Sequence, residues 1–356
     1  MNRKRIDIHF IAEKAGVSYT TVSRVMNNSS LVKPTTRRKV EALIRKHDYV
    51  PDYFARGLKR KRSYTIGLIV TNITYPFYPR IIRHIEEQAF NNGFSVILCD
   101  SGGDLEREKL EIGVLLEKKV DGIIAAPVDV PDSNEDLYRR IVASGKSVVF
   151  VNNFLEDVDT DSVRLDNIEA SQRITEHLIR IGHKRLGLIK DAFDRLASRE
   201  DGFRRAHEKH GMTIDPDLLV RRDISEGGIR TGLGDELDGH RFAKVLLSRS
   251  EPPTAIFASN DAMALGVCKY AHDSGIPIPD ELAVVGFDDV PYASFLNVPL
   301  TTMAQPSQEI AGAAFGLLRE RIESDSEILP RTVMVKAKLI VRESCGATRA
   351  RSVSSA

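Results

Sequence analysis

Two short amphipathic stretches separated by a glycine, within residues 7–27, constrain the fold of this chain more than any other feature. Asp7 is placed to cap a first helix, whose apolar residues recur with helical spacing up to Ala15. Gly16 follows, where a left-handed residue ends a helix, and Ser18 is placed to cap a second helix. Two short helices joined by a glycine turn are typical of a helix-turn-helix.

The second helix of this pair has an apolar face and a polar face. Val22, Val25 and Met26 share the side that we expect to pack against the first helix. The outward side carries Tyr19, Thr20, Ser23, Arg24 and Asn27. Hydroxyl, amide and guanidinium groups are the ones that read base edges and bind phosphates. On geometry alone, an ordinary helical hairpin with a solvated face remains the alternative.

The literal string from Ala15 to Asn27, Ala-Gly-Val-Ser-x-x-Thr-Val-Ser-Arg-Val-x-Asn, resembles the signature of the LacI/GalR family of bacterial transcription factors. The resemblance covers residues 7–343 and implies a sequence-specific DNA-binding regulator, preferably a repressor, that works as a homodimer. A symmetric dimer implies a near-palindromic double-stranded operator. The family pattern places base and phosphate contacts on the second helix and at the start of a third, at Ser18, Tyr19, Thr20, Thr21, Ser23, Arg24, Asn27, Thr36 and Arg37.

The charges of the chain are divided unevenly between its two ends. Residues 1–62 hold 16 Lys and Arg against 5 Asp and Glu, a net charge of +11, whereas the remaining residues hold 35 against 45, a net charge of −10. A basic head on an acidic body is the electrostatic pattern of a nucleic-acid-binding head. A solvated run of charge would be the alternative if the helix-turn-helix did not lie in the same segment.

Residues 51–63 form a basic linker that is too short to pack alone. The resemblance implies a hinge that becomes helical only on DNA, with Ala55 and Leu58 entering the minor groove. Gly57 departs from a good helix former and lowers helix propensity by about 1 kcal/mol. The alternative for Leu58 is an ordinary apolar linker residue.

From residue 64 onward, apolar runs such as Ile66–Val70 and Val148–Val151 alternate with amphipathic stretches. This rhythm predicts repeated βαβ units and a parallel sheet covered by helices. The resemblance implies a periplasmic-binding-protein-like body of two doubly wound parallel-sheet α/β subdomains behind the all-α head. The expected domains are a head at 1–50, the hinge at 51–63, a body at 64–343 and a disordered tail at 344–356, with an N-terminal subdomain of 64–165 and 295–324 and a C-terminal subdomain of 166–294 and 325–343.

Ligands of open α/β folds bind outside the carboxyl ends of the strands. Polar and aromatic residues that follow the expected strands include Asn72, Tyr75, Asn152, Asp166 and Asn260. By the family pattern, Phe77 and Tyr78 form an aromatic wall, Arg199 grips the effector and Asp288 is the carboxylate of the cleft. Rings that stack on sugar faces and groups that grip hydroxyls predict a small sugar-like or polyol-like effector. A capping or surface role is the alternative for each residue taken singly.

Three departures from the family pattern affect this site. Phe10 stands where the family often has Asp, and Asp191-Ala192 replaces a usual Gly-Pro ahead of Arg199. Residues 227–239 are a Gly-rich insertion beside the expected cleft. It is not a phosphate loop, because no Gly-Lys-Ser/Thr follows it.

Other classes of protein fit the sequence less well. A periplasmic sugar-binding protein would need a secretory signal, and the N-terminus is basic without an apolar region. A sugar-modifying enzyme would need a nucleophile elbow, a metal pair or a dinucleotide-binding loop, and none is found, so we expect no enzymatic activity and no cofactor.

The cysteine content and the apolar runs bear on where the chain works. Three scattered cysteines suggest a reducing cytoplasm and no metal site, and the absence of a long apolar run predicts no membrane span. The C-terminus carries no leucine heptad, which favours a dimer over a tetramer, with the helix Tyr78–Asn91 in the interface. We prefer release of DNA on effector binding over corepression.

Overall fold

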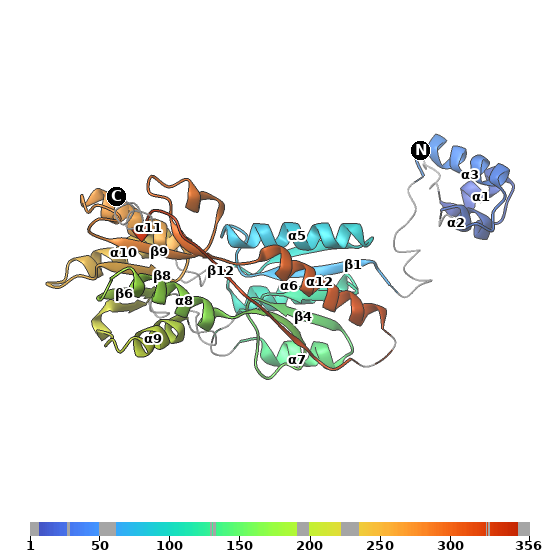
Figure 1. Ribbon diagram of the computed structural model, residues 1–356. Coiled ribbons are helices and arrows are strands. Elements are labelled where there is room, and N and C mark those ends of the chain that lie inside the picture. Colours follow the sequence, from blue (N-terminus) through green and yellow to red (C-terminus); the bar gives the residue numbers. More distant parts are fainter. Residues whose placement is uncertain are drawn as a thin grey trace. The chain divides into compact units, whose positions relative to one another are not determined.

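The structure is a computed structural model that describes residues 7–26, 29–49, 62–128, 130, 133–190, 199–221, 235–324, 326 and 328–347. The chain divides into two units, a head unit, Met1–Ser63, and a body unit, Tyr64–Ala356. Figure 1 shows the elements of both units.

The described residues of the head form three helices, namely α1 (Ile8–Ala15), α2 (Tyr19–Met26) and α3 (Pro34–Lys46). The expected signals set their ends: the Asp7 carboxylate accepts from the Phe10 amide at 2.8 Å, and Gly16 is left-handed at φ 65°. Ile11, Val22 and Val40 are buried where the three helices meet. The helix-turn-helix predicted from the sequence is therefore confirmed.

The body contains two sheets, each of six strands within the described residues. The first has the order β11-β5-β4-β3-β1-β2, and its strands run parallel. Its strands are β1 (Thr65–Val70), β2 (Ser95–Asp100), β3 (Gly122–Ala125), β4 (Ser147–Val151), β5 (Asp161–Leu165) and β11 (Thr332–Val335). Its helices are α5 (Phe77–Asn91), α6 (Leu105–Glu117), α7 (Glu135–Ala143) and α12 (Ser307–Glu323), of which α12 lies beside α5 (Figure 1).

The second sheet has the order β12-β10-β9-β8-β6-β7, with only β12 antiparallel. Its strands are β6 (Leu186–Lys190), β7 (Leu219–Arg221), β8 (Ala255–Ala258), β9 (Ala283–Asp288), β10 (Thr301–Ala304) and β12 (Lys338–Ile340). Its helices are α8 (Asn167–Arg180), α9 (Arg199–Lys209), α10 (Glu236–Leu247) and α11 (Asp261–Asp273), with short 3-10 turns η1 (Pro216–Leu218) and η2 (Pro291–Ser294). The two doubly wound subdomains are as predicted, and we call them the first and the second subdomain.

Three expected assignments within the body are wrong. β10 pairs with β9, so residues 301–304 belong to the second sheet and not to the N-terminal subdomain. Residues 325–343, expected in the C-terminal subdomain, hold two strands, of which β11 pairs with β5 of the first sheet and only β12 pairs within the second. The tail does not begin at Ser344, because that side chain is fully buried and donates to the Val284 carbonyl at 2.6 Å. Residues 348–356 lie outside the described residues.

Glycines allow helices α10 and α11 to pack closely. A Cβ atom at Gly239 would lie 2.0 Å from the Met263 carbonyl oxygen, and one at Gly266 would lie 2.0 Å from the Glu236 carbonyl oxygen. Backbone atoms cannot move aside as a flexible side chain can, so only glycine fits at these two positions.

We expect Gly266→Ala to lower the free energy of unfolding by about 1–3 kcal/mol, because the added methyl group forces the two helices apart. The matched control is Gly113→Ala in α6, where a Cβ atom meets nothing within 4 Å. The control should gain about 0.5–1 kcal/mol from helix propensity. Urea unfolding of both variants measures the difference, and equal midpoints would contradict the close packing of α10 on α11.

In the described part of the chain, no helix combines the length and the apolar character that crossing a membrane requires.

Candidate functional site

The recognition helix α2 begins with a hydroxyl pair. The Ser18 hydroxyl accepts from the Thr21 amide at 3.2 Å and lies 3.0 Å from the Thr21 hydroxyl. These two residues hold the first turn, as an N-cap should. Tyr19 is half exposed beside the His9 ring, and Arg24 is exposed. The polar face predicted to meet DNA is therefore turned outward at Tyr19 and Arg24, whereas Thr20 and Ser23 are half-buried.

Arg37, at the start of α3, bonds within the head. Its guanidinium donates to the Ser29 carbonyl at 2.7 Å and to the Val25 carbonyl at 3.4 Å. It thereby braces the turn that follows α2, a role the sequence does not reveal. Thr36 beside it is half-buried. Asn27 and the hinge residues Ala55 and Leu58 lie outside the described residues.

The strand orders place two switch points in the body, between β1 and β3 and between β6 and β8. At such points neighbouring connections leave toward opposite faces of the sheet and open a crevice at the carboxyl ends of the strands. Arg199 follows β6 and Ser259 follows β8, and the Arg199 guanidinium donates to the Ser259 carbonyl. Arg199 therefore stands at the switch point of the second sheet, where the fold places ligands.

Arg199 also lies against the end of β9. Its guanidinium carbon is 3.8 Å from the centre of the Phe287 ring, and its Nε lies 3.3 Å from the Asn167 side-chain oxygen. Burial raises the pKa of the Asp288 carboxyl, and the positive charge of Arg199 offsets part of this rise. The structure thus brings together Arg199 and Asp288, two of the predicted effector residues.

Asp288 ends β9 with a backbone that L-residues rarely adopt. Its φ is 118°, that of Asp289 is 55°, and the Asp288 side chain is 3% exposed. Strained residues of this kind concentrate at functional sites. The Asp288 carboxylate accepts from the Tyr75 hydroxyl, which belongs to the first subdomain, and from the Gln305 amide. Asp288 is therefore one point of contact between the two subdomains.

A second carboxyl, Asp261, lies near this point and is also buried. It accepts from the Thr302 hydroxyl at 2.6 Å and from the Val290 amide at 2.9 Å. Burial and, next, the negative charge of Asp288 raise the pKa of Asp261 well above its usual value. Its bonds hold the loop after β9 in place, which supports the strained Asp288 backbone.

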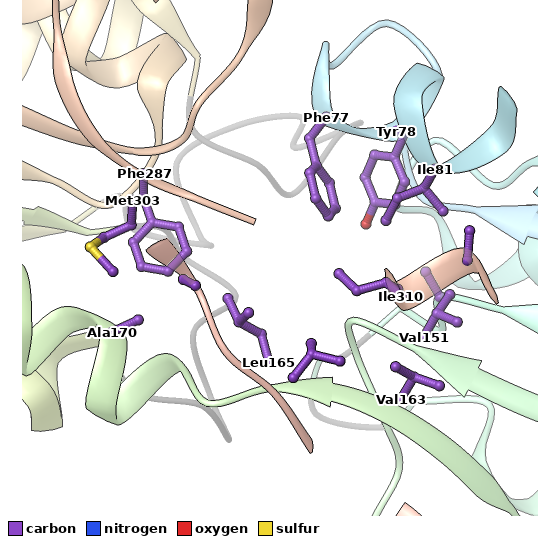
Figure 2. Close-up of a cluster of buried hydrophobic side chains, with 14 of the residues drawn as sticks. Phe77, Tyr78, Ile81, Val151, Val163, Leu165, Ala170, Phe287, Met303 and Ile310 are labelled. Atoms are coloured by element: carbon purple, nitrogen blue, oxygen red, sulfur yellow. The ribbon is translucent and has the colours of Figure 1, made fainter. Parts of the chain in front are cut away.

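The two predicted aromatic residues begin α5. Figure 2 shows Phe77 and Tyr78 on one side and Phe287 and Met303, from the second sheet, on the other. Phe77 and Tyr78 are buried, with ring centres 5.4 Å apart, and the Tyr78 oxygen accepts from the Thr71 hydroxyl at 2.7 Å. The aromatic wall faces the second subdomain, and Thr71, which follows β1, holds the Tyr78 ring in place.

Four further predicted residues have local roles in this structure. Asp166 and Asn260 cap α8 and α11, where their side chains accept from the amides of Glu169 and Met263. The Asn72 side chain accepts from Thr74 in a turn. Asn152 has a φ of 65°, the left-handed conformation that asparagine tolerates, and its amide lies 3.5 Å from Asn153. A capping or turn role accounts for these hydrogen bonds of Asp166, Asn260 and Asn72.

Sequence reasoning missed Gln305 and Arg80. Gln305 follows β10, a strand the sequence did not predict, so its position at a strand end was hidden. Arg80 was given no role from the sequence, and in the structure it donates to the Asp289 carbonyl at 2.8 Å. A groove of about 480 Å³ lies between Arg80, His84 and residues 305–309. Within the described residues, no group of three or more His, Cys, Asp or Glu is arranged to hold a metal ion.

Comparison with known proteins bears on both sites. Residues 7–52 match the family model described as bacterial regulatory proteins, lacI family, and residues 175–345 match a periplasmic binding protein-like domain. The ribose operon repressor of Escherichia coli (strain K12) is 32% identical over 314 residues, which cover 88% of this chain and 92% of that protein.

Two solved structures extend the comparison. A Lac repressor dimer bound to operator and the anti-inducer ONPF superposes with a TM-score of 0.83 at 25% identity, covering 96% of this chain and 99% of that one. A complex of the transcriptional regulator CelR with cellobiose superposes with a TM-score of 0.69 at 29% identity, covering 96% and 100%. The similarity thus spans the head and the body together.

Proposed function

Because this chain belongs to the LacI family of bacterial regulatory proteins, we propose that it represses transcription by binding a near-palindromic operator as a homodimer. A small sugar-like or polyol-like effector, bound between the two subdomains, controls that binding. The protein works in the cytoplasm and turns over no substrate. The observation that carries this function is a helix-turn-helix with an outward polar face, joined to a body in which the Arg199 guanidinium packs on Phe287, the residue before Asp288.

The head supplies the DNA-binding part of the proposal. Its net charge attracts phosphates, and the outward side chains of α2 have the chemistry for base edges. We propose that Tyr19, Thr20 and Arg24 select bases and that Ser18, Thr21, Ser23, Asn27, Thr36 and Arg37 position the helix on the backbone. In the proposed dimer, the hinges at residues 51–63 enter the minor groove between the two half-sites through Ala55 and Leu58.

The body supplies the effector-binding part. Arg199 and Asp288 offer a charged donor set and a charged acceptor, the pair that a polyhydroxyl ligand satisfies, and Phe77 offers an apolar face. A solved relative holds cellobiose and another holds glucose, which supports the same chemical class here. We propose that four residues that follow strands β1, β4, β5 and β8 contribute polar groups to the same site, namely Asn72, Asn152, Asp166 and Asn260.

Selection of bound duplexes from a random DNA library tests the DNA-binding part. The proposal predicts a sequence with two inverted half-sites, and an affinity that falls steeply as salt rises. Thermal shifts with D-ribose, D-glucose and cellobiose test the effector part. If the intact chain selects no preferred sequence from the library, the proposal of a sequence-specific regulator is wrong.

We expect Arg24→Ala to lose about 1–3 kcal/mol of operator affinity and to relax the preference at one base position in each half-site. The matched control is Arg45→Ala, an exposed arginine in the last turn of α3. Competition binding against operators with single base changes measures both effects. An equal loss of affinity for every sequence would show that Arg24 contacts only phosphate.

We expect the chain to be a dimer in solution, with α5 in the interface. Phe90 on this helix is 75% exposed, and Leu98 on the neighbouring edge strand β2 is 44% exposed, which leaves apolar surface for a second copy to cover. Light scattering measures the mass, and a tetramer or a monomer at micromolar concentration would contradict this expectation.

A further inference from the structure

The two oxygens of the Asp288 carboxylate are both occupied without a ligand. Oδ1 accepts from the Gln305 amide, and Oδ2 accepts from the Tyr75 hydroxyl. Gln305 lies in the segment that crosses from β10 to α12, whereas Tyr75 lies between β1 and α5. The carboxylate of the second subdomain is therefore capped by a donor from the first.

The donor and the acceptor are both buried. Tyr75 is 7% exposed and Asp288 is 3% exposed. Burial and, next, the negative charge of Asp288 raise the pKa of Tyr75 well above its usual value, so the hydroxyl keeps its proton at neutral pH and donates it. Hydrogen bonds to charged acceptors in such surroundings are stronger than those between neutral groups.

The segment that carries Asp288 is braced from its own subdomain. Arg342 pairs with the Asp289 carboxylate at 2.6 Å and donates to the Leu300 carbonyl at 2.7 Å. From the other subdomain, Arg80 donates to the Asp289 carbonyl at 2.8 Å. Tyr75 and Arg80 thus form two neighbouring ties from the first subdomain to one fixed segment of the second.

A tyrosine hydroxyl and a sugar hydroxyl offer a carboxylate the same O–H donor. We propose that Tyr75 is a specificity-determining residue that occupies Asp288 in the effector-free chain, so that a polyhydroxyl ligand reaches this carboxylate only by displacing the Tyr75 hydroxyl. This proposal rests on the proposed effector site. It makes Tyr75 both a tie between the subdomains and a competitor that sets the effector affinity.

Hydrogen exchange of the full-length, effector-free protein tests the tie. In Tyr75→Phe, the amides of residues 72–80 and of residues 288–292 should exchange about 5- to 10-fold faster, because one bond from each subdomain is lost. The matched control is Tyr138→Phe, since the Tyr138 hydroxyl also donates to a buried carboxylate, Glu108, at 3.2 Å, but within the first subdomain alone. The control should leave residues 288–292 unchanged.

Unchanged exchange at residues 288–292 in a folded Tyr75→Phe protein would overturn the proposal, and so would an equal change in Tyr138→Phe. A sugar from the thermal-shift test that raises the melting temperature is then titrated into the wild-type protein and into Tyr75→Phe. Tyr75→Phe should bind it at least about 5-fold more tightly, because the competitor is gone, and equal or weaker binding would overturn the competition. Operator binding by both variants is measured in parallel, so that failure of the proposed function is seen separately from failure of the tie.

Discussion

Asp288→Ala should bind operator within about 3-fold of the wild-type affinity and lose the response to effector. A charge-assisted bond to an effector hydroxyl contributes about 1.5–3 kcal/mol, so effector affinity should fall about 10- to 150-fold. The ligand then no longer distinguishes the two arrangements of the subdomains, and the coupling that depends on this difference disappears. Fluorescence anisotropy of labelled operator, with and without ligand, measures both quantities.

Removing this carboxylate also leaves the donors of Tyr75 and Gln305 without their acceptor. Asp288→Asn is therefore measured beside Asp288→Ala, because the asparagine side-chain oxygen still accepts one hydrogen bond although the negative charge is gone. Asp136→Ala, at an exposed position of α7, is the matched control and should respond to effector like the wild type. A full response in folded Asp288→Ala, or loss of operator binding by it, would contradict the assignment of Asp288.

Ile11→Ala should abolish operator binding without touching DNA. Ile11 is fully buried in α1, and truncating a buried isoleucine costs about 2–5 kcal/mol. A head of this size has little stability to lose, so the helix-turn-helix should unfold. Binding of effector by the body should remain, because the two units fold around separate cores.

The control for this substitution is Glu13→Ala, an exposed position on the same helix that alanine suits well. Operator affinity, helical circular dichroism and ligand-induced thermal shift are compared for both proteins. Operator binding by Ile11→Ala with wild-type affinity would contradict the claim that DNA recognition depends on the folded head.

The head was predictable from the sequence because its signals are local. Asp7, Gly16 and Ser18 set helix ends through contacts with residues only a few positions away. Each has the capping or helix-ending role predicted for it. The alternation of strands and helices and the two parallel-sheet subdomains of the body followed from the apolar runs and amphipathic stretches, whereas the order of the strands in each sheet was not predicted. Short-range chemistry and periodicity therefore accounted for the fold class.

Strand β10 was missed because its two threonines do not form an apolar run. Both threonines are buried, and hydrogen bonds satisfy their hydroxyls there. The Thr302 hydroxyl donates to Asp261, and the Thr301 hydroxyl donates to the Cys345 sulfur at 3.2 Å. These partners lie 41 and 44 residues away, so the burial of both threonines is a tertiary effect. With β10 hidden, Gln305 at its end was hidden as well.

The effector residues were predictable only in part, because a polar residue after a strand suits two roles. Asp166 and Asn260 cap helices, and a capping side chain at a helix start looks the same in sequence as one that faces a ligand. Asp288 differs by its strained backbone and by its donor from the other subdomain, and neither is visible in the sequence. The end of the expected Gly-rich insertion, residues 235–239, is in fact the N-cap and first turn of α10, so the expected bounds of the insertion are wrong there. Residues 191–198 and 222–234 lie outside the described residues, and the prediction for the rest of the insertion is untested.

The most direct test of the account is the affinity of the intact chain for its selected operator, measured without ligand and with a saturating concentration of the sugar that stabilises the body. We expect the sugar to weaken operator binding about 5- to 150-fold, the range of a coupling of about 1–3 kcal/mol. Stronger binding with sugar would reverse the preferred direction while keeping the coupling. An operator affinity that the bound sugar leaves unchanged would contradict the central claim that the body controls the head.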